Sequence, residues 1–324
     1  MTHHGRRRQG RSRPLLKGTL AIVAAIAIAA GVVIYNRTSD PDGPLPVDLP
    51  PSSSSYLGLY TAGVPNTYQG VTTFAKAAGA HPDVVMYYSG WFVPFPSKFA
   101  ATAANEGAVP LVQMDPDDVT VAGIASGRYD GYLSAYAEAV RNYHHPVILS
   151  FGHEMNGTWY PWGYRRTSPA VFVAAWRHIV SLFRALGARN VTWLWTVNII
   201  NDTKGGNIPQ PGPWWPGSSY VNWVGIDGYY LKPTWQFAPL FGPTISAVRR
   251  LTSDPILVAE TGAVPAADQA SKISDLFAGV RRYGLLGFVY FDSTNSAGQQ
   301  FDIRSSASFD AFRKGASTYS RPGS

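Results

Sequence analysis

The sequence contains no cysteine among its 324 residues. This absence excludes disulfide bonds, thiolate catalysis, cysteine-based zinc sites and lipid attachment through cysteine. Two common catalytic motifs are also missing, because the chain has no Gly-x-Ser-x-Gly segment and no glycine-rich phosphate loop. Neither a serine hydrolase nor an enzyme built on a phosphate-binding loop is therefore indicated.

Histidine is scarce, with seven residues, four of which stand in two adjacent pairs. One of the others, His153, precedes Glu154 and so begins like the zinc-protease motif His-Glu-x-x-His. Gly157 occupies the place of the second histidine, and the pair follows an expected strand rather than lying on a helix. We therefore expect no bound metal and no cofactor.

Acidic residues are absent from the first 37 positions, which hold seven of the 27 basic residues. The remaining 20 basic residues are balanced by 20 acidic ones, so the net charge of +7 belongs to the amino-terminal tail. A folded region without an overall basic field is not expected to bind nucleic acid.

One uncharged run of eighteen residues, 18–35, stands out. As a helix it would extend about 27 Å, close to the ~30 Å hydrocarbon core of a membrane. The basic segment 1–17 should then stay cytoplasmic, which predicts a single-pass cell-membrane protein with an extracellular domain. The alternative is a cleaved signal peptide and a secreted protein, because Ala-x-Ala spacings occur within 27–30.

Residues 36–55 are rich in proline, serine and aspartate and predict an extended, disordered linker. The catalytic domain is predicted to cover 56–320 and to act as a monomer. Within it, short apolar runs alternate with amphipathic stretches. The expected strands are 56–62, 83–89, 109–115, 146–152, 191–197, 221–227, 255–261 and 286–292, and the expected helices include 123–143, 168–187, 240–252 and 270–283.

Strand–helix alternation implies parallel strands covered by helices. Eight such units over about 265 residues predict an α/β fold of the (β/α)₈ TIM-barrel type. Residues 198–220 are too rich in glycine and proline for a long helix, so we expect a long functional loop there.

Two glutamates stand at the expected ends of strands. Glu154 follows the fourth strand, and Glu260 ends the apolar seventh strand. In a TIM barrel the carboxyl ends of the strands carry the active site, and strands four and seven face each other across it. Two carboxyl groups converging there fit glycoside hydrolysis, with one as proton donor and the other as nucleophile. The alternative is that each glutamate pairs with an arginine of the barrel.

The segment "GHEMNGTWYPWG" (152–163) resembles the acid/base segment of glycoside hydrolase family 26, a retaining (β/α)₈ family of clan A. "VAETGA" (258–263) resembles the nucleophile segment of that family, and "GIDGYY" (225–230) its strand-six motif. "FDSTNSAGQQFDIRSS" (291–306) resembles the strand-eight region. The resemblance spans roughly residues 56–315, with the motifs in the family's order.

The resemblance implies that Glu154 is the general acid/base. It also implies that His153 lies near the nucleophile or the sugar, with a buried structural histidine as the alternative. Asn156 would orient the local backbone or the sugar, or cap the following turn. Trp159 would be a sugar platform and Trp162 a second one, or else loop packing.

The same resemblance makes Glu260 the nucleophile, with Tyr229 donating a hydrogen bond that keeps it ionised. Asp227 would support the site or contact sugar, unless it is a buried structural residue. A raised pKa is expected for Glu154 because low-polarity neighbours such as Trp159 favour its protonated form.

Aromatic residues exceed what a core needs, and several stand in expected loops. Flat sugar faces stack on such rings, which predicts an open groove and endo-action; ordinary surface or interface packing is the alternative. The candidate platforms are Trp91, Trp214, Trp215, Trp235 and, on the last strand, Tyr290.

The family implies β-1,4-mannan as the first substrate, with β-glucan or β-1,3-xylan as alternatives. Strand three ends in "QMDPDD" (113–118), where mannanases tend to carry a Trp-His pair, so Gln113 and Asp115 are candidates for reading a different hydroxyl pattern. Strand eight likewise has Tyr290 and Phe291 in place of the clan's common tryptophan. Two other classes stay open: a barrel that binds polysaccharide without cutting it, and a structural barrel of the cell envelope.

Overall fold

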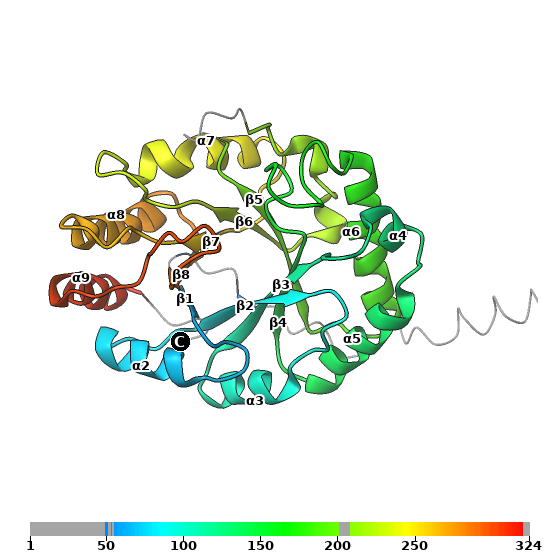
Figure 1. Cartoon of the computed structure of the whole chain (residues 1–324), viewed down its shortest axis with the longest axis horizontal. Helices are drawn as coiled ribbons and strands as arrows, with labels where there is room; N and C mark the ends of the chain where they lie inside the picture. Colours follow the sequence, from blue (N-terminus) through cyan, green and yellow to red (C-terminus); the bar gives the residue numbers. More distant parts are fainter. Residues whose placement is uncertain (1–48, 51–52, 54, 201–207, 320–324) are drawn as a thin grey trace, which may run out of the picture. The chain divides into compact units, whose positions relative to one another are not determined.

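The computed structural model describes residues 49–50, 53, 55–200 and 208–319. Eight parallel strands form a closed barrel in sequence order, with β1 pairing to both β2 and β8 (Figure 1). The strands are β1 (Tyr56–Thr61), β2 (Val84–Gly90), β3 (Val109–Asp115), β4 (Val147–Phe151), β5 (Val191–Asn198), β6 (Trp223–Asp227), β7 (Ile256–Thr261) and β8 (Gly287–Asp292). The predicted TIM barrel is confirmed, and each predicted strand boundary lies within two residues of the observed one.

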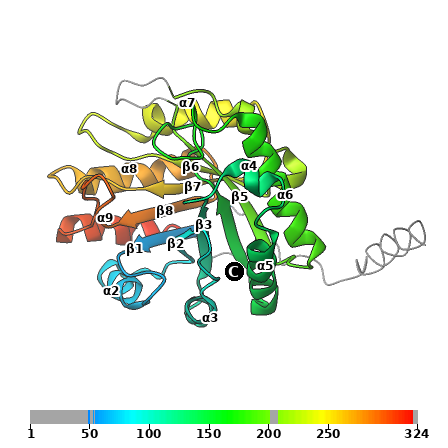
Figure 2. The ribbon, with the colours of Figure 1, turned by 45° about the vertical axis from the view of Figure 1, so that its right-hand side comes forward.

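Helices surround the strands on the outside of the barrel, as Figures 1 and 2 show. They are α2 (Gln69–Ala78), α3 (Ser97–Asn105), α4 (Val121–Ala125), α5 (Asp130–Tyr143), α6 (Pro169–Ala185), α7 (Phe237–Arg249), α8 (Gln269–Arg282) and α9 (Ser306–Ala316). The predicted helix 123–143 is in fact two helices, because the chain turns at Gly127, whose φ of 77° lies in the left-handed region.

No long helix follows β5 in the described part of the chain. Residues 208–222 contain only two short 3₁₀ turns, Gly212–Trp214 and Ser218–Tyr220. This agrees with the predicted long loop over 198–220, of which residues 201–207 lie outside the described ranges.

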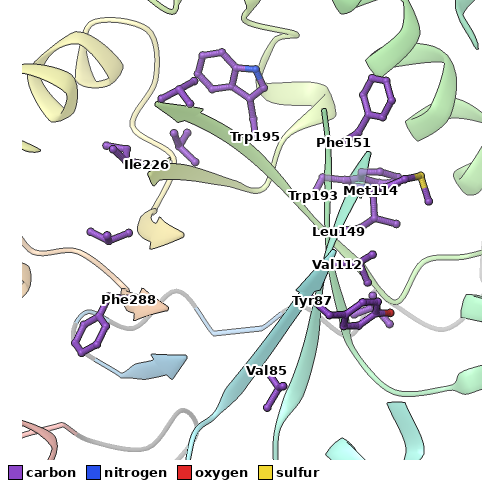
Figure 3. Close-up of a cluster of buried hydrophobic side chains, with 14 of the residues drawn as sticks. Val85, Tyr87, Val112, Met114, Leu149, Phe151, Trp193, Trp195, Ile226 and Phe288 are labelled. Carbon is purple, nitrogen blue, oxygen red and sulfur yellow. The ribbon is translucent and has the colours of Figure 1, made fainter. Parts of the chain in front are cut away.

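Strand side chains alternate between two cores because successive residues of a strand point to opposite faces. The outer core lies between strands and helices and includes Val85, Val112 and Leu149 (Figure 3). The inner core fills the barrel and includes Met86, which follows Val85, and Leu111, which precedes Val112. We call this alternation the phase of a strand. It decides which side chains point into the barrel and can reach its open end.

The last residues of the predicted linker contact the barrel. Leu49 packs against the inner core, and the Ser53 hydroxyl donates a hydrogen bond to the Leu285 carbonyl at 3.2 Å. The Tyr56 hydroxyl donates to the Pro50 carbonyl at 2.8 Å. These described residues of the linker thus contact apolar and polar groups next to β1 and β8, and the disorder of the linker as a whole stays a prediction.

The predicted tail 1–17 and anchor 18–35 lie outside the described residues. Within the ranges that are described, no helix combines the length and apolar character needed to cross a membrane.

Candidate active site

Glu154 lies in a tight turn just beyond β4. Its φ is +54°, a left-handed value that costs a non-glycine residue about 1–3 kcal/mol and is concentrated at functional sites. The backbone N–H of Glu154 donates to the Thr196 carbonyl at 3.0 Å, which fixes this turn to β5. The carboxyl group accepts hydrogen bonds from Asn198 Nδ2 at 2.5 Å and from Trp159 Nε1 at 2.6 Å.

Glu260 reaches the inner face of the barrel through a bulge in β7. Leu257 belongs to the inner core and Val258 to the outer one, so strict alternation would place Glu260 on the helix side. The register with β6 and with β8 shifts at this point, which gives β7 one extra residue. A bulge of this kind redirects a side chain, and both oxygens of Glu260 accept hydrogen bonds from phenols, those of Tyr88 and Tyr229.

Glu154 and Glu260 line one cavity of about 600 Å³. Rings and apolar side chains from several strands make up part of its wall, and Tyr60 and Phe291 stack on each other with ring centroids 4.4 Å apart. The segment 294–299 after β8 adds polar groups. The cavity is lined by Tyr60, Tyr88, Glu154, Trp159, Tyr160, Asn198, Ile199, Gly228, Tyr229, Leu231, Trp235, Glu260, Phe291, Thr294, Asn295, Ser296, Ala297 and Gln299.

The two carboxyl groups have raised pKa values. Burial raises the pKa of Glu154 from 4.5 to about 7; the charge of His153 opposes this rise and that of Glu260 adds to it. Burial also raises the pKa of Glu260, against the opposing effects of His153, Tyr229 and Tyr88. The two phenols keep their hydrogens because burial and the charge of Glu260 raise their pKa values well above 10.0. They are therefore donors, which suits an ionised Glu260.

His153 is buried and does not line the cavity. Its Nδ1 lies 2.9 Å from Asp115 Oδ1, and its Nε2 lies 3.1 Å from the Tyr160 hydroxyl. Burial alone would lower the pKa of His153, but Asp115, Glu154 and Glu260 raise it to about 9. His153 therefore lies near the nucleophile, one of the two predicted positions, because its charge lowers the pKa of Glu260 and its ring lies beside that of Tyr88. It does not line the cavity, so the other predicted position, beside the sugar, is not what the structure presents.

Asn156 is fully buried and clamps the end of β5. Its Oδ1 accepts from the Asn198 N–H at 2.8 Å, and its Nδ2 donates to the Asn198 carbonyl at 2.8 Å. Asn198 in turn donates to Glu154. Asn156 thus orients the local backbone, one of the three predicted roles, and it does not line the cavity.

Trp159 lines the cavity as predicted, whereas Trp162 does not. Trp159 is 43% exposed, so its ring face remains available beside Glu154. Trp162 is buried, stacks on Tyr160 with centroids 4.4 Å apart, and donates from Nε1 to the His153 carbonyl at 2.7 Å. The prediction of Trp162 as a sugar platform is replaced by its alternative, loop packing.

Three other predicted platforms pack elsewhere. Trp91 is buried against Tyr132, and it is the next residue, Phe92, that is exposed, with a φ of 66°. Trp214 is buried, and Trp215 packs edge-on against Trp195 at 5.0 Å. None of the three lines the cavity described above, whereas Trp235, predicted with them, does.

Tyr290 points away from the cavity for a simple reason of phase. It belongs to the outer core, and its hydroxyl donates to the Phe301 carbonyl at 3.0 Å. Its neighbour Phe291 belongs to the inner core and lines the cavity. The prediction of Tyr290 as a substrate contact is therefore wrong by one residue.

Asp227 and Gln113 are fully buried and do not reach the cavity surface. Asp227 pairs in register with Glu260, and neither of its oxygens has a hydrogen-bond partner among the residues that the structure describes. Burial, Glu260 and Glu154 raise its pKa well above 3.8, which favours its neutral form. Asp115 is occupied by His153. Neither Gln113 nor Asp115 is placed to read sugar hydroxyls directly.

Several cavity residues were not among the predicted ones, although the alternation of side chains along the strands could have indicated them. Tyr60 shares the phase of the inner-core residue Tyr56, and Tyr88 that of Met86. Counting in twos from a known inward residue would have selected both, and likewise Phe291. Asn198, at the end of β5, follows the same rule from Leu194.

A closed (β/α)₈ barrel that holds two buried carboxyl groups in one cavity fits the class of barrel-fold glycoside hydrolases. Within it, residues 83–278 match the model of glycosyl hydrolase family 26. The chain belongs to glycosyl hydrolase family 26, as its sequence motifs predicted.

Among curated proteins, the chain is 32% identical over 203 residues to Endoglucanase H of Acetivibrio thermocellus, covering 59% of this chain and 22% of that protein. It is 27% identical over 186 residues to Beta-1,3-xylanase TXYA of a Vibrio species, covering 56% of this chain and 35% of that protein. The chain thus matches only about a fifth to a third of the length of these relatives.

Solved structures share the fold. Bacillus subtilis mannanase man26 aligns with a TM-score of 0.60 at 15% identity, over 80% of this chain and 85% of that one. The Bacteroides ovatus β-mannanase BoMan26A aligns with a TM-score of 0.59 at 15% identity, over 84% and 91%. At this identity the likeness shows the barrel fold alone.

Proposed function

We propose that the protein is a retaining endo-β-glycanase that cleaves a neutral β-linked polysaccharide. The observation that carries the proposal is that Glu154 and Glu260 line one cavity and have different hydrogen-bond partners. Glu154 accepts from an amide and an indole and has a pKa of about 7, which suits a group that gives and takes a proton. Glu260 accepts from two phenols, which suits a fixed nucleophile.

The first chemical step uses both carboxyl groups. Glu260 attacks the anomeric carbon while Glu154 donates its proton to the glycosidic oxygen, so the leaving sugar departs neutral and a covalent glycosyl-enzyme forms. In the second step Glu154, now a base, removes a proton from water, and the water oxygen displaces Glu260. Retention is proposed because the motifs around Glu154 and Glu260 resemble those of a retaining family, and the two phenols that donate to Glu260 suit a nucleophile held in a fixed position.

We propose β-glucan as the first substrate class. The relative at 32% identity is an endoglucanase, and the "QMDPDD" segment lacks the Trp-His pair that mannanases tend to carry. Rings of Tyr60, Trp159 and Trp235 line the cavity and suit stacking on flat pyranose faces. The expectation of β-1,4-mannan stays a prediction, and β-1,3-xylan is kept open by the Vibrio relative.

Reducing-sugar release from barley β-glucan, curdlan, mannan and β-1,3-xylan tests the proposal. Glu154→Gln and Glu260→Gln should abolish release, whereas Glu138→Gln, on the outer face of α5, is the matched control and should not. Proton NMR of the first product formed should show the β-anomer. Tight binding to one polymer with no release from any would instead favour a binding protein.

We further propose that residues 18–35 hold the barrel outside the cell membrane. The support is the uncharged run behind a basic segment without acidic residues. Full-length protein should sediment with membranes and be digested by protease added to intact cells, and deletion of residues 1–35 should release it. A soluble extracellular protein that begins after residue 30 would establish signal cleavage instead.

A further inference from the structure

A chain of three polar side chains leads from the buried interior to the cavity. Asp115, at the end of β3, contacts His153 Nδ1 at 2.9 Å, and His153 Nε2 contacts the Tyr160 hydroxyl at 3.1 Å. Asp115 and His153 are buried, whereas Tyr160 is half-buried and lines the cavity with Glu154 and Glu260. The chain ends at a hydroxyl that a sugar can touch.

The ring of Tyr160 is held rigidly. It stacks on Trp162 with centroids 4.4 Å apart and an interplanar angle of 8°, and it meets the His153 ring edge-on at 4.8 Å. Trp162 is itself tied to the His153 carbonyl. Because the phenol cannot swing, the position of its oxygen is fixed and only the direction of its hydrogen remains to be decided.

Hydrogen-bond roles decide that direction. The Asp115 carboxylate can only accept, so His153 carries a hydrogen on Nδ1. If Nε2 also carries one, it donates to the Tyr160 oxygen, and the phenolic hydrogen must point elsewhere. Among the described residues the Tyr160 hydroxyl has no hydrogen-bond partner besides His153, so the open direction is the cavity.

The charges around His153 favour this doubly protonated form. Asp115 from β3, Glu154 from the turn after β4 and Glu260 from β7 all raise the pKa of His153, to about 9. The neighbouring Tyr88 ring on β2 lies with its centroid 5.6 Å away, and its hydroxyl is bound to Glu260. Asp117, whose pKa is itself raised by burial, also lies within the electrostatic influence of His153.

We propose that Tyr160 reads the substrate as an obligate donor, because the buried Asp115–His153 pair turns its hydroxyl hydrogen toward a hydroxyl oxygen of the sugar bound beside Glu154 and Glu260. Tyr160 is then a specificity-determining residue, and Asp115 and His153 are positioning residues that act through it. The partner is the neutral polysaccharide of the proposed function. This inference rests on the proposed function for the identity of the ligand class.

A double-mutant cycle tests the coupling. Oligosaccharide affinity is measured by calorimetry in the Glu154→Gln background, using the fragment of whichever polymer the protein cuts or binds. Tyr160→Phe should weaken affinity about 10-fold, as expected for one hydrogen bond. Asp115→Asn should weaken it similarly when Tyr160 is present but less than about twofold after Tyr160→Phe. Tyr164→Phe, which removes a hydroxyl from the same segment outside the cavity, is the control and should change little.

Equal effects of Asp115→Asn in both backgrounds would overturn the proposal, since Asp115 would then act on the carboxyl groups or the fold alone. Unchanged affinity after Tyr160→Phe would do the same. If Asp115→Asn does not fold, a second measurement compares how Tyr160→Phe and the parent bind a set of monodeoxy analogues of the oligosaccharide. One of them should bind Tyr160→Phe and the parent alike, and uniform losses across the set would refute the contact. Because affinity is the readout, failure to hydrolyse any polymer would count against the proposed function and not against this inference.

Discussion

Replacing Glu154 by glutamine should change how stability depends on pH. Burial raises the pKa of this carboxyl from 4.5 to about 7, so the folded state binds its proton more tightly than the unfolded state does. The stabilisation is complete below pH 4.5 and is lost as the pH rises to about 7. At about 1.4 kcal/mol per pKa unit the full effect is about 3 kcal/mol, most of which is lost between pH 5 and pH 9.

Urea unfolding at pH 5 and pH 9 measures this difference. Glu154→Gln should lose about 2–3 kcal/mol less than the parent between the two values. A constant offset is also expected, because one of the two groups that donate to Glu154, Asn198 Nδ2 or Trp159 Nε1, then faces an amide N–H. Glu138→Gln, on the surface of α5, controls for charge removal. Identical losses in the parent and in Glu154→Gln would show that this carboxyl is not held protonated by burial.

Three further predictions concern residues that surround the two carboxyl groups. Tyr88→Phe and Tyr229→Phe each remove a hydrogen bond that lowers the pKa of Glu260, so the acid limb of kcat/KM should move to higher pH and kcat/KM should fall about 10- to 100-fold. Trp159→Phe removes a bond that lowers the pKa of the acid/base carboxyl, so the alkaline limb should also move to higher pH. Asn156→Ala unclamps the end of β5 and should destabilise the fold by about 1–3 kcal/mol in urea unfolding.

The barrel fold could be predicted from the sequence because its strands are apolar runs of regular length separated by amphipathic stretches. Buried parallel strands need such runs whatever the surrounding loops do. The division of 123–143 into α4 and α5 was missed because its cause is a single left-handed glycine, Gly127, inside an otherwise periodic stretch.

Side-chain direction was harder to predict than strand position. Tyr290 and Phe291 are adjacent aromatics, and only the phase of β8 decides that Phe291 lines the cavity. For Glu260 the phase rule itself fails, since the bulge in β7 reverses the expected direction. The motif resemblance placed Glu260 correctly where alternation would have turned it toward the helices.

Loop tryptophans were the least predictable residues. Trp91, Trp162 and Trp214 are all buried, because a large ring in a loop of this barrel finds other rings to pack against. Trp159 is exposed although it stands only three positions before the buried Trp162. No local signal in "GTWYPWG" distinguishes the two, and the difference depends on which of them meets His153 and Tyr160 in three dimensions.

His153 stands next to Glu154 in the sequence, and its charge acts on the pKa values of the two carboxyl groups. Binding a metal or a sugar would not explain this effect. The charge of His153 lowers the pKa of both Glu154 and Glu260, while burial raises both. Without this cation, the buried carboxyl groups would hold their protons to higher pH, and Glu260 would be a poorer nucleophile near neutrality. Asp115 keeps the cation in place and gives the buried pair no net charge. The histidine of the motif therefore acts on both carboxyl groups through its charge, and its hydrogen bond to Tyr160 connects it to the cavity.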